Sequence, residues 1–292
     1  MTPGGDPARA IVVRVSGPTA TVCIDGVLRE ARVDRRLPGR PAVAGDRVRA
    51  RAEGDDLVVV EIRPRRTLLE RGDGWERRAR PLAANADLLL ITASVVDPPL
   101  RPGLLDRYLV AAEVGGLAAA LVVTKSDLPH DREELASVAE RYRALGYPVV
   151  VGSAHETGTV ESVRALIAGG LAILAGHSGV GKSTLTAALT GVDRATGAVS
   201  ERAGTGRHTT TDPRLIPLPG AGAVIDTAGV RTFHLPRMER ADLERGFREI
   251  HAASVDCRFR GCAHDGDAGC AVAPRVDPGR VASYRKLLHD LG

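Results

Sequence analysis

Residues 176–183 read GHSGVGKS, which has the residue types and spacing of a phosphate-binding loop, G-x-x-x-x-G-K-[ST]. The octapeptide follows the apolar run LAILA and precedes the helix-forming run TLTAALTG, which is the context that such a loop requires. Its glycines let backbone N–H groups approach phosphates, and the helix N-terminus favours anions. We expect Lys182 to reach the β- and γ-phosphates and Ser183 to ligate Mg²⁺. The residues expected to contact the nucleotide are Gly176, His177, Ser178, Gly179, Val180, Gly181, Lys182, Ser183 and Thr184.

A second candidate for phosphate chemistry is IDTAG at 225–229, a D-x-x-G pattern at the end of an apolar run. We expect Asp226 to hold Mg²⁺, directly or through water, because carboxylate oxygens suit this ion. The N–H of Gly229 is expected to meet the γ-phosphate. The pattern is common by itself, but its place shortly after a phosphate-binding loop makes it a stronger indication.

Between these motifs lies GTGRHTTTDP at 204–213, a polar segment rich in Gly and Thr. Segments in this place of a nucleotide-binding domain act as switch loops that order around the γ-phosphate. Thr209 or Thr210 is expected to sense that phosphate, and Thr210 to complete a Mg²⁺ shell with Ser183 and Asp226. The alternative interpretation is an ordinary flexible loop.

Two further motifs have the chemistry of a guanine-reading pocket. TKSD at 124–127 is one letter from N-K-x-D, and its Asp127 can accept hydrogen bonds from guanine N1 and N2, which adenine cannot offer. Lys125 would lie along the base plane. The GSA that follows the next apolar run would supply the Ala154 N–H to guanine O6. The predicted base-reading residues are Thr124, Lys125, Ser126, Asp127, Ser153 and Ala154.

Three of the four cysteines cluster with a histidine near the C-terminus, in the order Cys257, Cys262, His264 and Cys270. Three thiolates and one imidazole complete a tetrahedral zinc site with no open position, so the pattern predicts one structural zinc ion rather than a catalytic metal. The alternatives are reduced free thiols, or a disulfide with one cysteine left over.

Composition limits the class of protein that these motifs serve. The 292 residues are 43% hydrophobic and 26% charged, as expected for packed cores with an ordinary surface. The first residues show no secretory leader, and no run of 18 apolar residues predicts a membrane span, so we expect a cytoplasmic protein without a membrane partner. Only three lysines occur, and two of them, Lys125 and Lys182, lie in the motifs above. In an Arg-rich chain, these lysines indicate a need for a compact ammonium group.

The elements that must position these motifs begin with short strands over residues 10–63, which predict an N-terminal OB-fold β-barrel. Residues 1–66 carry 13 Arg against 9 acidic residues, which suits a phosphate-rich partner such as RNA. The alternative is a solvated basic surface. The same residues contain no Phe, Tyr or Trp, so we expect contacts through arginine and phosphate rather than through base stacking.

After a charged linker at 67–81, residues 82–235 alternate apolar runs with helical patterns, which predicts an α/β domain with a mostly parallel sheet. Ligands of such sheets lie at the carboxyl ends of the strands, where every motif above falls. Residues 236–292 form the third part, in which we expect a helix around 240–253, the Cys/His cluster and a last helix.

The combination of TKSDL, GSA, GHSGVGKST, GRHTTT, DTAGV and the Cys/His spacing, in that order, resembles the circularly permuted, ribosome small subunit-dependent GTPases of the RsgA (YjeQ) family. The resemblance covers the whole chain. It implies a barrel, a circularly permuted P-loop GTPase domain whose base-reading half comes first, and a helical zinc-binding C-terminal domain. It also implies GTP hydrolysis stimulated by the small ribosomal subunit, late in the maturation of that subunit.

Two positions depart from what the resemblance leads us to expect. The family has Asn at the position of Thr124, where the amide contacts guanine and braces the phosphate loop, so weaker guanine affinity is expected here. Val230 stands where Ras-like enzymes place the glutamine that orients water. His208 is therefore the candidate for contact with the attacking water, alongside Thr209 and Thr210 in the same loop; the alternative is that His208 anchors the loop.

We therefore predict a monomeric GTPase that binds GTP, GDP and the small ribosomal subunit with its rRNA. Two alternatives remain open. The first is an RNA-binding adaptor with a regulatory or degenerate nucleotide site, which Thr124 and Val230 keep under consideration. The second is an ATPase that reads adenine instead.

Overall fold

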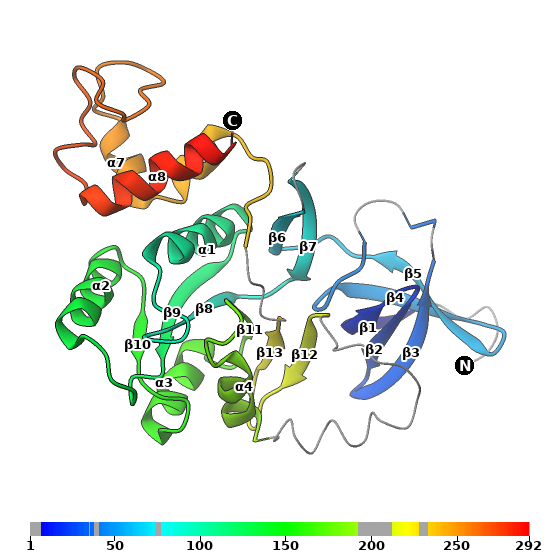
Figure 1. The fold of residues 1–292 in the computed structure, drawn as a ribbon. Coiled ribbons are helices and arrows are strands. Elements are labelled where there is room, and N and C mark those ends of the chain that lie inside the picture. The colour runs from blue at the N-terminus through cyan, green and yellow to red at the C-terminus, as the bar shows by residue number, and fades with distance from the viewer. Residues whose placement is uncertain are drawn as a thin grey trace.

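Five short strands close the first part of the chain into a barrel in the computed structural model (Figure 1). The structure describes residues 7–34, 36–37, 41–73, 77–191, 212–227 and 233–291. Strand order around the barrel is β1-β2-β3-β5-β4, and the small apolar side chains that alternate along the strands fill its interior. The predicted OB-like barrel is confirmed. Its strands are β1 (Ala8–Ser16), β2 (Thr19–Ile24), β3 (Val27–Val33), β4 (Arg47–Glu53) and β5 (Asp56–Ile62).

The segment that the sequence presents as a charged linker forms most of a two-stranded antiparallel sheet, β6 (Leu68–Asp73) and β7 (Arg78–Ala84). Leu69 and Ala83 are buried beneath it. The N–H of Gly72 donates to the carbonyl of His234 over 2.8 Å, and a Cβ at Gly72 would lie 2.6 Å from the Leu235 carbonyl oxygen. The sheet is therefore held against the chain that leaves the central domain, rather than joining two domains loosely.

The central domain is a six-stranded sheet of order β10-β9-β8-β11-β13-β12, parallel except for β12 at one edge. Its strands are continuous apolar runs because helices cover both of its faces. The sheet confirms the predicted α/β class. The strands are β8 (Leu88–Ser94), β9 (Ala118–Thr124), β10 (Val149–Val151), β11 (Leu171–Gly176), β12 (Arg214–Pro217) and β13 (Ala223–Asp226).

Two pairs of helices cover the sheet, one pair on each face. Leu105 of α1 and Tyr142 of α2 share one core with Ile91, whereas Val163 of α3 and Leu185 of α4 share the opposite core. Each of these helices follows a strand whose carboxyl end carries one of the motifs or a loop beside them. The motifs therefore lie together at the carboxyl edge of the sheet. The helices are α1 (Pro102–Val114), α2 (Arg132–Ala144), α3 (Thr157–Ile167) and α4 (Lys182–Thr190).

The C-terminal part packs on α1 at the end of the molecule opposite the barrel (Figure 1). It contains α6 (Arg240–Arg245), α7 (Arg248–Ser254) and α8 (Pro278–Leu291). The single helix expected around 240–253 is two helices. The break falls at Gly246, where a Cβ would lie 2.7 Å from the Cα of Val110, so close contact with α1 fixes a residue of low helix propensity at this point.

A buried charge cluster joins this part to the central domain. Arg280 of α8 is 1% exposed and forms ion pairs with Asp106 of α1 and, over 2.6 Å, with Glu249 of α7. Its guanidinium carbon lies 4.3 Å from the centre of the Phe247 ring. The hydroxyl of Tyr142 from α2 donates to the Asp106 carboxylate over 2.7 Å. Four helices from both domains therefore meet at one side chain.

Within the described ranges, every helix is too short or too polar to span a lipid bilayer.

Candidate nucleotide-binding site and metal centre

The predicted phosphate-binding loop runs from the end of β11 to the first turn of α4. A Cβ at Gly176 would lie 2.1 Å from the carbonyl oxygen of Thr92, so only glycine permits this close approach to β8. Gly181 precedes α4 with φ of 88°, a left-handed conformation that favours glycine. These glycines shape the backbone so that the first N–H groups of α4 remain available to an anion.

Lys182 lies inside this loop and is only 5% exposed. Its Nζ donates to the carbonyls of Gly176 and His177, over 2.8 Å and 2.9 Å. The ammonium group is thereby held at the centre of the loop, where it can meet phosphate oxygens. Ser183 and Thr184, the next two residues, are exposed at the start of α4.

Thr124 connects the base-reading motif to the phosphate-binding loop. Its side chain is buried, and its Oγ1 lies 2.6 Å from the carbonyl oxygen of Val180 and 3.0 Å from that of Ala93. A hydroxyl has one proton, so it donates to one of the two carbonyls at a time. The threonine therefore braces the phosphate loop directly, which the sequence interpretation had assigned to a longer amide side chain.

The TKSD and GSA motifs meet at the ends of β9 and β10. The hydroxyl of Ser153 donates to the Asp127 carboxylate, and this hydrogen bond holds the pKa of Asp127 below its usual range. The backbone N–H of Ser126 donates to the carbonyl of Gly152 over 3.3 Å. Ser153 and Ala154 are both buried. A carboxylate with a lowered pKa thus stands beside a hydrogen-bonded backbone turn, and these are the groups that the predicted guanine pocket would use.

The side chain of Lys125 lies across the same edge of the sheet. Its backbone adopts φ of 62°, and its Nζ donates to the carbonyl of Asp97 in the loop that follows β8. The hydroxyl of Ser94 at the end of β8 donates to the carbonyl of Pro98 over 2.8 Å. The loop after β8, which the sequence analysis had not singled out, therefore belongs to the wall of the site.

Asp226 ends β13 and is 4% exposed. It pairs in register with Leu174 of the strand that leads into the phosphate loop, and the neighbouring Thr227 hydroxyl donates to the Leu174 carbonyl over 2.7 Å. An exposed hydroxyl at Ser183 and a carboxylate on the adjacent strand are oxygen donors of the kind that Mg²⁺ prefers. The donor set at this edge therefore fits the ion.

Several predicted site residues lie outside the described residues. These are the three residues of the switch segment and two that follow Asp226: His208, Thr209, Thr210, Gly229 and Val230.

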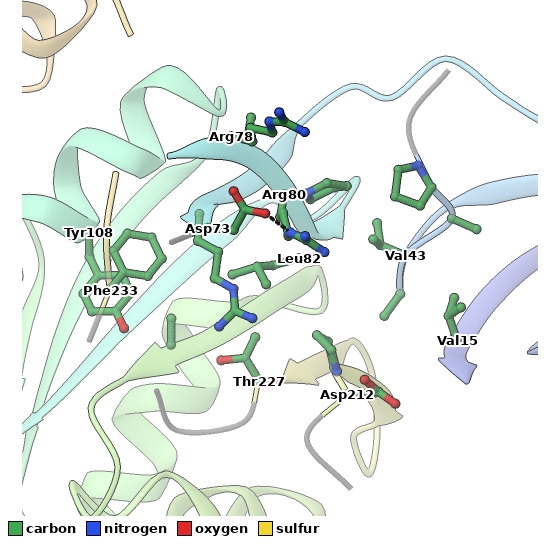
Figure 2. A pocket seen from close by; sticks show the side chains of 18 of the residues that line it. Val15, Val43, Asp73, Arg78, Arg80, Leu82, Tyr108, Asp212, Thr227 and Phe233 are labelled. Carbon is green, nitrogen blue, oxygen red and sulfur yellow. Dashed lines mark hydrogen bonds and ion pairs between the residues drawn. The ribbon is translucent and has the colours of Figure 1, made fainter. Parts of the chain in front are cut away.

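A groove of about 780 Å³ separates the barrel from the nucleotide edge of the sheet (Figure 2). Arg71, Arg78 and Arg80 of the β6–β7 sheet line it, and Arg80 forms an ion pair with Asp73. Stacked rings of Tyr108 and Phe233, with centroids 4.2 Å apart, lie at one end of the groove. The linker predicted over 67–81 does not include this groove; the alternation of arginine with small residues in RARPLAA was the available signal.

The C-terminal cysteines and histidine converge on one point, as their spacing predicted. One ligand atom from each residue lies within 4.8 Å of the others, and the members are Cys257, Cys262, His264 and Cys270. Nδ1 of His264 lies 3.7 Å from the Sγ atoms of both Cys257 and Cys270. All four cysteines of the chain are described, and none forms a disulfide, which removes that alternative. The cluster can hold a metal ion.

The loop that carries these ligands is fastened by arginines that the sequence analysis did not identify. Arg240 of α6 donates to the carbonyls of Gly261, over 2.8 Å, and Cys262. Arg285 of α8 donates to the carbonyl of His264 over 2.7 Å. No local sequence pattern predicts either contact, because each arginine lies more than 20 residues from the carbonyl that it binds.

His264 is prepared for metal binding by its surroundings. Burial lowers the pKa of His264, so the imidazole remains neutral, as a ligand must be. Its Nε2 lies 3.7 Å from the carboxylate of Glu244 on α6. This distance is too long for a hydrogen bond, so the carboxylate acts on the ring as a neighbouring negative charge. Donor type and geometry both fit a tetrahedral site that prefers zinc.

Comparisons with known proteins agree with this geometry. A model of the RsgA GTPase family matches residues 62–236. Proteins from Azotobacter vinelandii and Ectopseudomonas mendocina, both named small ribosomal subunit biogenesis GTPase RsgA, are each 40% identical over 259 residues, which cover 85% of this chain and 75% of the relative. The crystal structure of YjeQ from Thermotoga maritima is 27% identical with a TM-score of 0.71, and covers 97% of this chain and 98% of its own.

The crystal structure of YloQ, described as a circularly permuted GTPase, shares the fold with a TM-score of 0.71 at 23% identity, and covers 99% of this chain and 96% of its own. The order of motifs in the present chain is that of a permuted domain, since TKSD precedes GHSGVGKS in sequence while both lie on one edge of the sheet. Fold, motif order and family match together show that this chain belongs to the RsgA GTPase family.

Proposed function

We propose that this chain is a GTPase of late small-subunit maturation, which binds the small ribosomal subunit in its GTP state and leaves after hydrolysis to GDP and phosphate. The observation that carries the proposal is the bond from Thr124 at the end of β9 to the phosphate loop at Val180, which joins the base-reading motif to the phosphate-binding loop. The relatives' names supply the partner.

In this proposal Asp127 selects guanine and Lys182, with the backbone N–H groups at the start of α4, binds the phosphates. Ser183 and Asp226 hold Mg²⁺, with Thr210 as a third ligand. The ion would neutralise charge on the β- and γ-phosphates. Thr209 senses the γ-phosphate. His208 contacts the attacking water, because Val230 cannot orient it.

The Cys/His cluster holds one zinc ion that stabilises the C-terminal part without taking part in hydrolysis. Its donor set leaves no open coordination position, which supports a structural role. The Arg-rich barrel contacts rRNA through phosphates. We further propose that the chain acts as a monomer in the cytoplasm.

Co-sedimentation with small subunits tests this function. The full chain is centrifuged with purified small subunits in the presence of GDP or of a non-hydrolysable GTP analogue. We expect retention with the analogue and release with GDP. Equal sedimentation in both nucleotides would contradict a nucleotide-controlled cycle.

The adaptor alternative predicts that Lys182→Ala keeps both subunit binding and its dependence on nucleotide. If the chain is a GTPase, this variant loses nucleotide binding, and its retention on small subunits no longer differs between GDP and the GTP analogue. The brace from Thr124 to Val180 removes one of the two reasons for the adaptor, because the substituted position still supports the phosphate loop.

A further inference from the structure

Aromatic side chains are scarce in this chain, and those that the structure describes are buried with one exception. The sequence has 3 Phe, 4 Tyr and 1 Trp. Of the seven in the described ranges, six are at most 4% exposed: Tyr108, Tyr142, Tyr147, Phe233, Phe247 and Tyr284. Phe259 is 54% exposed. The exposed ring presents a flat apolar face, and covering that face with a ligand would be favourable.

Phe259 lies in the loop CRFRGC, between two of the metal-binding cysteines. Three features constrain the loop. Its ends are two members of the Cys/His cluster that can hold a metal ion; Arg240 donates to the carbonyls of Gly261 and Cys262; and the N–H of Cys262 donates to the Phe259 carbonyl over 3.3 Å. A ring on such a support loses little conformational freedom when it binds.

The ring is flanked by two exposed arginines, Arg258 and Arg260. The guanidinium carbon of Arg258 lies 5.4 Å from the ring centre. In the part of the chain that the structure describes, no carboxylate forms an ion pair with either arginine. The nearest acids in sequence are otherwise engaged: Asp256 with Arg275, Asp265 with Arg285, and Asp267 with the Cys262 thiol and the Ala263 N–H.

Beside the ring a cavity of about 550 Å³ opens to the surface; Arg240, Arg260 and Glu244 line it together with three members of the Cys/His cluster, Cys257, Cys262 and His264. Val255 is 76% exposed. The face therefore combines a flat aromatic ring with two flanking guanidinium groups that form no ion pair in the described part of the chain. A planar, anionic ligand complements both features, since a base stacks on an aromatic ring while its phosphates meet arginine.

We propose that Phe259, with Arg258 and Arg260, binds an unpaired nucleotide of RNA: the base stacks on the Phe259 ring and the two arginines contact the flanking phosphates. The inference rests on the proposed function and refines it, because it divides recognition between two modules. The barrel, without any aromatic residue, contacts the backbone of folded RNA, whereas the tip of the metal-binding loop reads a base that is splayed out of the helix.

Affinity for small subunits tests the proposal. The full chain with intact metal centre is titrated with small subunits in a non-hydrolysable GTP analogue. Phe259→Ala is expected to weaken binding by about 5- to 150-fold, the range for loss of one stacked base, while Phe259→Trp retains it. Val255→Ala is the matched control, since it removes a more exposed apolar side chain from the same face. Metal content and GDP affinity should be unchanged in all three variants.

Salt dependence adds a second readout. Arg260→Gln is expected to lower the slope of log affinity against log salt by about one, because one phosphate contact is lost. Unchanged affinity of Phe259→Ala, or equal losses in Phe259→Ala and Val255→Ala, would overturn the proposal. If the unaltered chain itself failed to bind small subunits, the proposed function would fall and this inference with it.

Photo-cross-linking distinguishes RNA from protein as the partner. A benzophenone amino acid is incorporated in place of Phe259, and the complex with small subunits is irradiated. We expect a cross-linked product that ribonuclease removes. A product with a ribosomal protein, or no product despite full binding, would overturn the proposal while leaving the GTPase function intact.

Discussion

The hydroxyl of Thr124 lies 2.6 Å from the carbonyl oxygen of Val180, so the base-reading motif is hydrogen-bonded to the phosphate-binding loop. The two segments are 56 residues apart in sequence. Guanine recognition at one end of the nucleotide and phosphate recognition at the other therefore share one support. Thr124, which stands where N-K-x-D has Asn, therefore still braces the phosphate-binding loop.

Replacing Thr124 by Val keeps the shape of the side chain and removes this bond. The Val180 carbonyl then lacks a buried partner, which costs about 1–2 kcal/mol. We expect affinity for a fluorescent GDP analogue to fall about 5- to 30-fold. Thr124→Ser, which keeps the hydroxyl, is the control and should bind nearly as tightly as the unaltered chain. Equal affinity in Thr124→Val and Thr124→Ser would show that the brace is not used.

Asp127→Asn tests base selection. The amide replaces one acceptor of the carboxylate by a donor. The variant should therefore bind GTP more weakly and xanthosine triphosphate more tightly, because the base of the latter offers the matching acceptor. Competition of GTP, xanthosine triphosphate and ATP against a fluorescent nucleotide measures the change. An unaltered preference among the three nucleotides would support the adenine-reading alternative instead.

The Asp127 carboxylate also predicts a pH dependence. Its pKa is lowered by the hydrogen bond from Ser153, so the ionised form that binds guanine persists as the pH falls toward the ordinary carboxyl range. Affinity for GDP is therefore expected to be flat from pH 8 down to about pH 5. Ser153→Ala removes the bond and should move the acid limb of the GDP-binding curve to higher pH. Coincident acid limbs in the two proteins would contradict this assignment.

The elements that could be predicted are those whose signal is local. Long apolar runs predicted the parallel sheet, and the Cys/His spacing predicted a cluster that the fold brings together. The β6–β7 sheet was missed because LLERGD has no regular alternation of apolar and polar residues. The break at Gly246 depends on contact with Val110, and the ion pair of Arg280 with Asp106 joins residues 174 apart in sequence. Tertiary contacts of this kind leave no trace in a local pattern.

The buried cluster around Arg280 predicts a large loss of stability when one partner is removed. Arg280→Met leaves Asp106 and Glu249 buried without their counter-ion, which costs about 3–5 kcal/mol. Arg275→Met is the matched control, because its ion pair with Asp256 is more than half exposed on both sides and contributes at most about 1 kcal/mol. Denaturant unfolding measures both variants. A similar small shift in both would mean that the Arg280 cluster does not hold the C-terminal part in place.

The metal centre predicts one tightly bound zinc ion per chain. Cys270→Ser removes one thiolate, so zinc content should fall and the C-terminal part should unfold at lower temperature. Cys23→Ser is the control, since Cys23 lies in β2 of the barrel. Zinc release is followed with a chromogenic chelator. Full zinc content in Cys270→Ser would contradict the assigned ligand set.

The rate of GTP hydrolysis with and without small ribosomal subunits shows most directly whether the subunit completes the catalytic site. Multiple-turnover phosphate release is measured for the full chain alone, with small subunits, and with large subunits as control. We predict slow hydrolysis alone, because Val230 cannot orient water, and a strong acceleration by small subunits only. Equal rates in all three conditions would contradict the proposal that the subunit completes the site.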